Sequence, residues 1–219
     1  MRSILKKLLS PFLQKAGALY VSKPRKYTYK NLSVVVQPGV FPPFLTISTK
    51  LLLDFVDNLD LEGKTFLELG CGCGIISILA AKKGALVTAS DISTIALEAL
   101  RTNSEANQTS IDVIHSDLFD SLGNKAFDFI VINPPYYPKN PTNIAESAWF
   151  CGENFEYFQK LFKQLPQNSA TVFMILSEDC EIETIKSLGQ IQGFTLELIS
   201  SKKVVAEENF IFSIVPSSR

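Results

Sequence analysis

From Thr65 onward, short apolar segments alternate with longer segments of helical length, and this alternation limits the fold more than any other feature. Strands that alternate with helices form a mostly parallel sheet covered by helices on both faces. The last two strands have no helix between them, so we expect a C-terminal antiparallel hairpin. The predicted seven-stranded α/β fold has strands at 65–69, 86–90, 111–115, 127–132, 170–176, 194–200 and 209–215 and helices at 75–83, 94–107, 153–165 and 180–192.

Composition and cysteine usage narrow the class of protein. Hydrophobic residues make up 46% of the 219 residues and charged residues 20%, which is enough for a core without disulfides or metals. No apolar run reaches the roughly 18–20 residues that span a bilayer, so we expect no integral membrane association. Cys71, Cys73, Cys151 and Cys180 form no C-x-x-C pair and His115 is the one histidine, which argues against zinc and against a secreted disulfide scaffold. We expect a cytoplasmic protein without a metal.

Charge is distributed unevenly along the chain. Residues 1–30 carry eight lysines and arginines and no acid, so this segment is +8 while the remainder is −9. Apolar residues recur at helical spacing near its start, which predicts a basic helical arm over 1–30 followed by a single domain over 31–219. A basic arm on an acidic body favours contact with RNA, a ribosome surface or anionic lipid. A solvated amphipathic helix along one edge of the fold and an organelle transit peptide are the alternatives.

The segment before the alternating region has its own pattern. Residues 27–37 predict a β-hairpin with its turn near Lys30-Asn31, and residues 38–43 predict a loop. A helix running through Leu59 follows, with Ser48 or Thr46 as its cap. We expect the hairpin and helix, within 31–60, to lie on the substrate side of the domain.

A glycine-rich loop, Glu68-Leu69-Gly70-Cys71-Gly72-Cys73-Gly74, joins the first core strand to a helix. Glycines at alternate positions let the backbone turn sharply and approach a ligand closely. The spacing differs from the dinucleotide pattern G-x-G-x-x-G, because Ile75 occupies the position of the third glycine. A purely structural turn is the alternative interpretation.

Two acids end the next two strands. Asp91, followed by Ile92, lies 23 residues after Glu68, where a carboxylate can accept both ribose hydroxyls of a nucleoside. Asp117, followed by Leu118, ends the third strand. A helix N-terminal charge is the alternative for Asp91, and a helix cap for 118–122 is the alternative for Asp117.

The segment Asn133-Pro134-Pro135-Tyr136 closes the strand FDFIVI. Two consecutive prolines fix the backbone and remove two donors, which leaves the Asn133 side-chain oxygen and the Pro134 carbonyl as acceptors. We expect this pair to hold the two hydrogens of a planar NH₂ group, with Tyr136 stacked on its plane. A chance turn at the strand end is the alternative.

Together these motifs resemble the class I S-adenosylmethionine-dependent methyltransferases with an N-P-P-Y motif. This HemK-like group includes the release-factor glutamine methyltransferases and the amino methyltransferases of DNA and RNA. The resemblance covers about residues 36–215. It implies a Rossmann-like domain that transfers a methyl group to an amino or amide nitrogen, with a protein (a release factor or ribosomal protein), RNA or DNA as the partner.

The same resemblance implies the residues of the site. In the segment Pro38–Leu53, Phe41 and Thr49 correspond best to the residues that frame the methyl-transfer pocket, and Thr46 less well. The acid at Asp117 would accept from the adenine amino group, and Leu118 would pack on the ring. The implied cofactor-binding residues are Thr49, Glu68, Gly70, Cys71, Gly72, Gly74, Asp91, Ile92, Asp117, Leu118 and Asn133, the catalytic residues are Asn133, Pro134, Pro135 and Tyr136, and the substrate-binding residues are Phe41, Asn133 and Tyr136.

Two other functions compete with this interpretation. A catalytically inactive scaffold built on a nucleotide fold has no need for the N-P-P-Y pocket, and an NAD-dependent dehydrogenase does not fit the glycine spacing. Three aromatic residues beyond the motif, Trp149, Phe150 and Phe155, are candidates for a substrate groove, with core packing expected for at least one of them.

Overall fold

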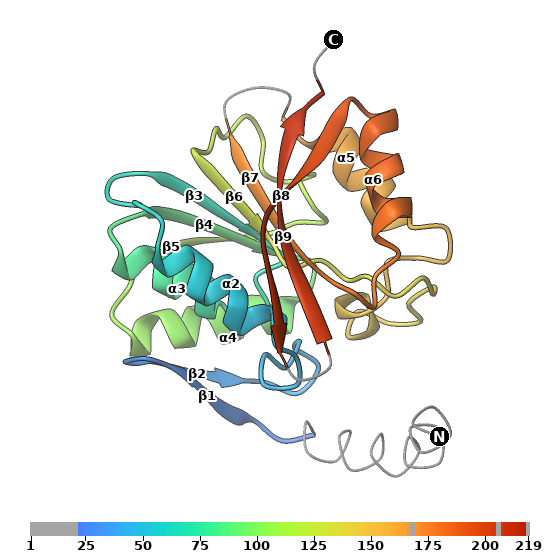
Figure 1. Ribbon diagram of the computed structural model, residues 1–219. Helices are drawn as coiled ribbons and strands as arrows, with labels where there is room; N and C mark the ends of the chain where they lie inside the picture. The colour runs from blue at the N-terminus through green and yellow to red at the C-terminus, as the bar shows by residue number, and fades with distance from the viewer. Residues whose placement is uncertain (1–21, 167–169, 205–206, 218–219) are drawn as a thin grey trace.

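The computed structural model describes residues 22–166, 170–204 and 207–217. Its central sheet has seven strands in the order β5-β4-β3-β6-β7-β9-β8 (Figure 1). The first five of these run parallel, and β9 is antiparallel to both β7 and β8, as expected from the sequence. The strands are β3 Thr65–Leu69, β4 Leu86–Asp91, β5 Ile111–His115, β6 Phe129–Ile132, β7 Thr171–Ser177, β8 Phe194–Val204 and β9 Glu207–Pro216.

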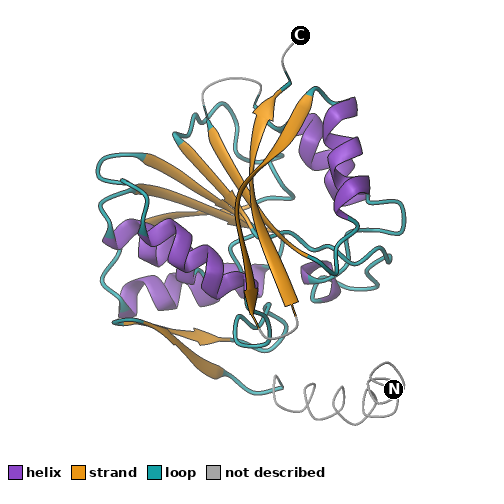
Figure 2. Ribbon diagram, in the orientation of Figure 1, coloured by secondary structure: helices purple, strands orange, loops and turns teal. Residues whose placement is uncertain are grey.

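The helices form two groups, one on each face of the sheet (Figure 2). One apolar cluster joins the sheet to α2 Ser48–Asp57, α3 Ile75–Lys82 and α4 Thr94–Ala106. A second cluster joins the opposite face to α5 Glu156–Gln164 and α6 Ile182–Ile191. The central strands are accordingly buried on both faces, and this explains the continuous apolar runs in their sequences.

A separate hairpin, β1 Arg25–Tyr29 and β2 Leu32–Val36, lies beside α3 and α4 (Figure 1). Its turn at Lys30-Asn31 is the predicted one. The expected boundary after residue 30 is too late, because β1 already begins at Arg25 and Lys30 pairs with Asp57 of α2. Most of the predicted helical arm lies outside the described residues.

Two asparagines of α4 hold this hairpin in place. The buried Asn103 side chain accepts a hydrogen bond from the Val35 amide at 2.8 Å and donates to the carbonyls of Val35 and Cys73, each at 3.0 Å. The Asn107 side chain makes the same pair of bonds with the backbone of Ser33. Asn103 therefore links the hairpin to the glycine-rich loop, whereas Asn107 contacts the hairpin without reaching that loop.

Several local expectations are wrong. The predicted cap of the helix after the loop is absent, because α2 already includes Ser48, its N-cap is Ile47, and no side chain caps it. The helix ends at Asp57 rather than continuing through Leu59. No helix forms at 118–122, where the chain makes consecutive turns, so Asp117 is not a helix cap. α5 starts at Glu156 rather than 153, because Phe155 takes a left-handed backbone conformation with φ 61°.

The described helices include none that is both long and apolar enough to cross a membrane.

Candidate functional site

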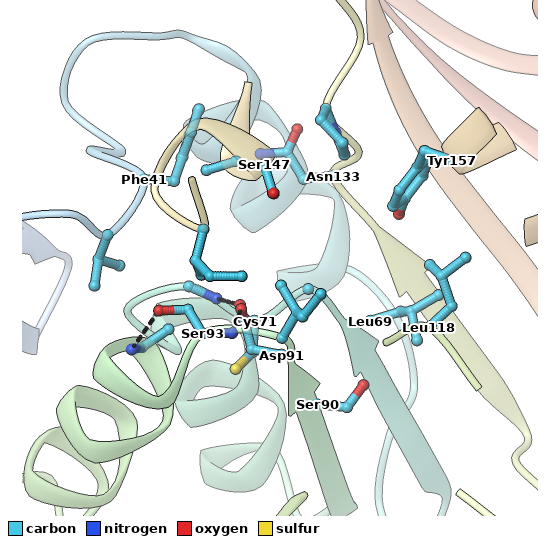
Figure 3. A pocket seen from close by; sticks show the side chains of 18 of the residues that line it. Phe41, Leu69, Cys71, Ser90, Asp91, Ser93, Leu118, Asn133, Ser147 and Tyr157 are labelled. Atoms are coloured by element: carbon cyan, nitrogen blue, oxygen red, sulfur yellow. Dashed lines mark hydrogen bonds between the residues drawn. The ribbon is translucent and has the colours of Figure 1, made fainter. Parts of the chain in front are cut away.

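A cavity of about 470 Å³ lies at the carboxyl ends of β3, β4, β5 and β6 (Figure 3). The chain order of the strands reverses at β3, which lies between β4 and β6, and the crevice at such a switch point is where open α/β sheets bind ligands. The volume falls in the usual range for a small-molecule site. The loops after all four strands line it, and residues 39–43 and the 140–152 segment form its other wall.

The glycine-rich loop is held against β4 by backbone bonds. The amides of Gly70 and Cys71 both donate to the Ser90 carbonyl at 2.9 Å. Gly74 does not line the cavity; it has a φ of 76° at the start of α3, where a Cβ would lie 2.0 Å from Leu100. Gly74 is therefore required for the turn and for helix packing, while Gly70, Cys71 and Gly72 line the cavity.

Glu68 is buried beneath this loop. Its carboxylate accepts from the Ser77 amide at 2.8 Å and from the Ser77 hydroxyl, so it satisfies a free donor in the first turn of α3. Burial raises the pKa of Glu68 to about 8, and the Ser77 hydrogen bonds only partly oppose that rise. Although Glu68 lines the cavity, its hydrogen bonds hold the loop and the helix together.

Asp91 is the last residue of β4, and its carboxylate is hydrogen-bonded to the glycine-rich loop. One oxygen accepts from the Gly72 amide at 2.9 Å and the other from the Ser93 amide at 2.8 Å. Burial raises its pKa, and the backbone donors oppose that shift. Each oxygen keeps a further lone pair, so the predicted contact with two ribose hydroxyls remains sterically and chemically available. Asp91 and Ile92 both line the cavity.

Asp117 and Leu118 line the far end of the cavity. Leu118 has a φ of 52°, and its carbonyl accepts from the Ser116 hydroxyl at 2.7 Å. Asp117 forms an ion pair with Lys160 of α5, with 2.6 Å between Oδ2 and Nζ. The sequence does not indicate Lys160, because its partners are 40 and 43 residues away.

Asn133 lies directly after β6, and its amide nitrogen donates to the Thr49 hydroxyl at 3.4 Å. With Nδ2 directed at α2, the side-chain oxygen remains as an acceptor. Asn133, Thr49, Phe41 and Ser147 all line the cavity (Figure 3). Thr46 lies outside the lining and contacts the Ser48 hydroxyl instead.

The rest of the tetrapeptide departs from expectation. Pro135 lines the cavity, whereas Pro134 and Tyr136 do not. Tyr136 is 7% exposed and packs in the apolar cluster around α5 and α6, with its ring 4.9 Å from that of Tyr137. The position of Tyr136 therefore does not match the predicted stacking on a substrate plane, because this side chain fills the core.

The segment after Tyr136 forms a compact wall over the cavity. Tyr137 and Phe150 form a parallel bridge, and the Cys151 and Gly152 amides donate to the carbonyls of Tyr137 and Lys139. Phe150 lines the cavity with the Lys139 ammonium 4.5 Å from its ring centroid, while the Trp149 ring lies 4.8 Å from that of Phe41. Phe155 is a core residue, as expected for at least one of the three aromatic residues.

The cavity fits a nucleoside that carries an amino-acid chain. Asp91 and Asp117 are acceptors at the carboxyl ends of two neighbouring strands, and the glycines of the loop after β3 permit close approach of a ligand to the backbone. Ser90 is among the lining residues, but its hydroxyl is fully buried and has no hydrogen-bond partner among the described residues. A buried hydroxyl without a partner is costly.

Comparison with known proteins identifies the family. The methyltransferase small domain profile matches residues 31–150. A Methanocaldococcus jannaschii protein named "Putative protein N5-glutamine methyltransferase" is 32% identical over 194 residues, which cover 84% of this chain and 95% of that protein. The ribosomal RNA small subunit methyltransferase C of Haemophilus influenzae is 40% identical over 113 residues. That match covers 50% of this chain and only 33% of the Haemophilus protein.

Solved structures show the same fold. The T. thermophilus 16S rRNA methyltransferase, solved with AdoMet and guanosine, has a TM-score of 0.60 at 20% identity and covers 88% of this chain and 51% of its own. The E. cuniculi complex that methylates the translation termination factor eRF1 has a TM-score of 0.64 at 21% identity. The match covers 82% of this chain and 99% of the chain in that complex. Combined with the family match, this likeness identifies the chain as a member of the methyltransferase small domain family and an S-adenosylmethionine-dependent methyltransferase.

Proposed function

We propose that this protein methylates the side-chain amide nitrogen of a glutamine in a protein. The observation that carries the proposal is Asn133, which lines the cofactor cavity with its Nδ2 bonded to Thr49 and its oxygen left as an acceptor. A carboxamide oxygen in this position can accept an N–H of a planar amide and fix the orientation of that nitrogen.

The extent of the similarity favours a protein acceptor over a nucleic-acid base. The Methanocaldococcus relative aligns over 95% of its length, whereas the match to the Haemophilus rRNA enzyme stops at a third of that protein. The relative aligned along almost its whole length is the better guide to the acceptor, and its name is that of a protein glutamine methyltransferase.

The residues around Asn133 define what this chain contributes to the reaction. S-adenosylmethionine, when bound, supplies an electrophilic sulfonium methyl group. Asp91, Asp117 and the glycine-rich loop would hold it, because they line the same cavity. Asn133 would orient the acceptor nitrogen, and its amide dipole would stabilise the positive charge that develops there. Phe41, Phe150 and the 140–152 segment would exclude water from that end of the cavity.

Labelled-methyl transfer into a cell extract tests the proposal. The expected result is label that protease releases and nuclease does not, and that alkaline hydrolysis converts to methylamine, as for an N-methylated side-chain amide. The Asn133→Ala variant serves as the background reaction. Label recovered as a methylated nucleoside would show that the acceptor is a base amine rather than glutamine, and it would overturn the proposal. Label in neither form would also overturn it.

A further inference from the structure

Helix α5 presents three residues to the cofactor cavity that the sequence motifs do not include, namely Glu156, Tyr157 and Lys160. Tyr157 and Lys160 are three residues apart and both line the cavity, whereas Lys163, one turn further, does not. Residues at this spacing share one face of a helix. Figure 3 shows the Tyr157 hydroxyl directed toward Leu69 and Leu118.

Lys160 connects two acids of the loop after β5. Its Nζ lies 2.6 Å from Oδ2 of Asp117 and 2.6 Å from Oδ2 of Asp120. The other Asp120 oxygen accepts from Gln164, one turn further along α5, at 2.6 Å. The Asp117 carboxylate is half-exposed but fixed through one oxygen, and its Oδ1 has no hydrogen-bond partner among the described residues.

Asp117 is the acceptor left for one end of the cavity. Of the other lining carboxylates, Glu68 is buried beneath the glycine-rich loop, where it accepts from Ser77, and Glu156 accepts through both oxygens from Asn154. Asp91 lies at the glycine-rich loop. A nucleoside with its ribose at Asp91 would direct the edge of its base toward the loop after β5.

We propose that Lys160 is a positioning residue that sets the Asp117 carboxylate to accept a hydrogen bond from the exocyclic amino group of adenine. The ion pair holds Oδ2 against Lys160, so Oδ1 is the oxygen left to accept a hydrogen bond from a ligand in the cavity that Asp117 lines. Selectivity for the base therefore depends on α5 and not only on the loop that follows β5. This inference depends on the cofactor and not on the identity of the methyl acceptor.

The test compares two cofactor products that differ at one position of the base. S-adenosylhomocysteine carries an amino donor at the 6-position, and S-inosylhomocysteine carries a carbonyl acceptor there. A fixed carboxylate binds the first and repels the second, so the wild-type dissociation constants should differ by about 10- to 100-fold, the range for one hydrogen bond to a charged group. Calorimetry measures both constants without any methyl acceptor.

Lys160→Met retains much of the aliphatic stem and removes the charge, and Lys163→Met makes the same change on the same helix outside the cavity. We expect K160M to weaken S-adenosylhomocysteine binding and to lower the preference for adenine at least fivefold. Lys160→Arg, which keeps a positive donor, should restore most of that preference, and K163M should match the wild type. An unchanged preference in K160M, or an equal loss in K163M, would overturn the proposal.

A second variant keeps the proposal testable if K160M does not fold. Asp117→Asn leaves Lys160 in place and offers an amide that can donate to a carbonyl. The preference for adenine should then fall to near unity or reverse. Retention of the wild-type preference in D117N would show that Asp117 does not contact the 6-position, which would also overturn the proposal.

Discussion

Asn133 depends on a neighbour from another element for its orientation. An amide side chain can present either its oxygen or its nitrogen to a ligand, and these have opposite hydrogen-bonding character. The hydroxyl of Thr49 accepts from Nδ2 and thereby favours the orientation that leaves the oxygen available to accept from a ligand. The sequence predicts both residues in the pocket, but the contact between them follows from the packing of α2 against the sheet.

Asn133→Ala should therefore impair catalysis more than cofactor binding. We expect kcat to fall by roughly 10²- to 10³-fold, as for the loss of one aligned polar group in a transition state. The dissociation constant for S-adenosylmethionine should change by less than about tenfold, since one neutral contact is lost. Single-turnover kinetics and calorimetry measure the two quantities, with Asn124→Ala, at an exposed turn outside the cavity lining, as the control. A variant with wild-type kcat would remove Asn133 from the mechanism.

Glu68 makes the stability of the protein depend on pH. Burial raises its folded-state pKa to about 8 from an unfolded value near 4.5. Folding is therefore favoured by the protonated form, and this contribution is complete below pH 4.5 and is lost as pH rises toward and through 8. The Glu68→Gln variant has no ionisable group at this position, so this pH dependence of the free energy of unfolding disappears. Urea unfolding at pH 5.5 and pH 8 should show a larger fall in the free energy of unfolding for the wild type than for the variant, and equal falls would contradict the assignment.

Not every residue of the motifs could be placed from the sequence. Asp91 and Leu118 could be placed, because the end of a parallel strand has a fixed position relative to its neighbours. Tyr136 could not, because its burial against the cluster around α5 and α6 depends on segments far along the chain. Lys160 was missed for the same reason, since a lysine on an amphipathic helix normally indicates only a solvated face.

At the scale of elements, the hairpin and the cofactor loop are joined through α4. The three bonds of Asn103 reach both β2 and the Cys73 carbonyl, so a displacement of the hairpin would disturb the glycine-rich loop. The hairpin itself is predictable from its alternating residues and turn. Its contact with α4 is not, because an asparagine late in a helix gives no indication of a partner 68 residues away.

Replacing each asparagine separates stability from cofactor binding. Asn103→Ala leaves buried backbone groups without partners and should lower the free energy of unfolding by about 2–4 kcal/mol. It should also raise the dissociation constant for S-adenosylmethionine severalfold, because the loop loses a support. Asn107→Ala should lower stability by about 1–2 kcal/mol and leave cofactor affinity unchanged, because it contacts only Ser33 and its own helix. Urea titration and calorimetry measure both, and equal affinities in the two variants would refute the link.

At the scale of the whole molecule, the charge of the chain is divided between a basic N-terminal segment and an acidic remainder. Part of that basic segment, Arg25 and Lys26, lies in β1, and Lys30 is paired with Asp57. The remaining positive charges are mostly outside the described residues. A surplus of positive charge in one segment favours contact with a polyanion such as RNA.

A salt titration examines this reading of the basic segment. If the basic segment contacts about three phosphates of ribosomal RNA, the association constant for RNA should fall roughly 40-fold between 50 and 200 mM salt. Each phosphate contact steepens the plot of log association constant against log salt concentration by about 0.9. Fluorescence anisotropy with a labelled RNA helix measures that slope. An affinity independent of salt would mean that these lysines and arginines do not bind phosphate.

The position of β9 has a consequence for the order in which the molecule can assemble during synthesis. β9 follows β8 in the chain but lies between β7 and β8 in the sheet. A nascent chain that has emerged only as far as Val204 therefore has a β8 with no neighbouring strand, and the backbone groups along its edge await a partner not yet made. β9 is the strand that joins β8 to the rest of the sheet, and until it emerges the growing polypeptide exposes the edge of β7 to other chains.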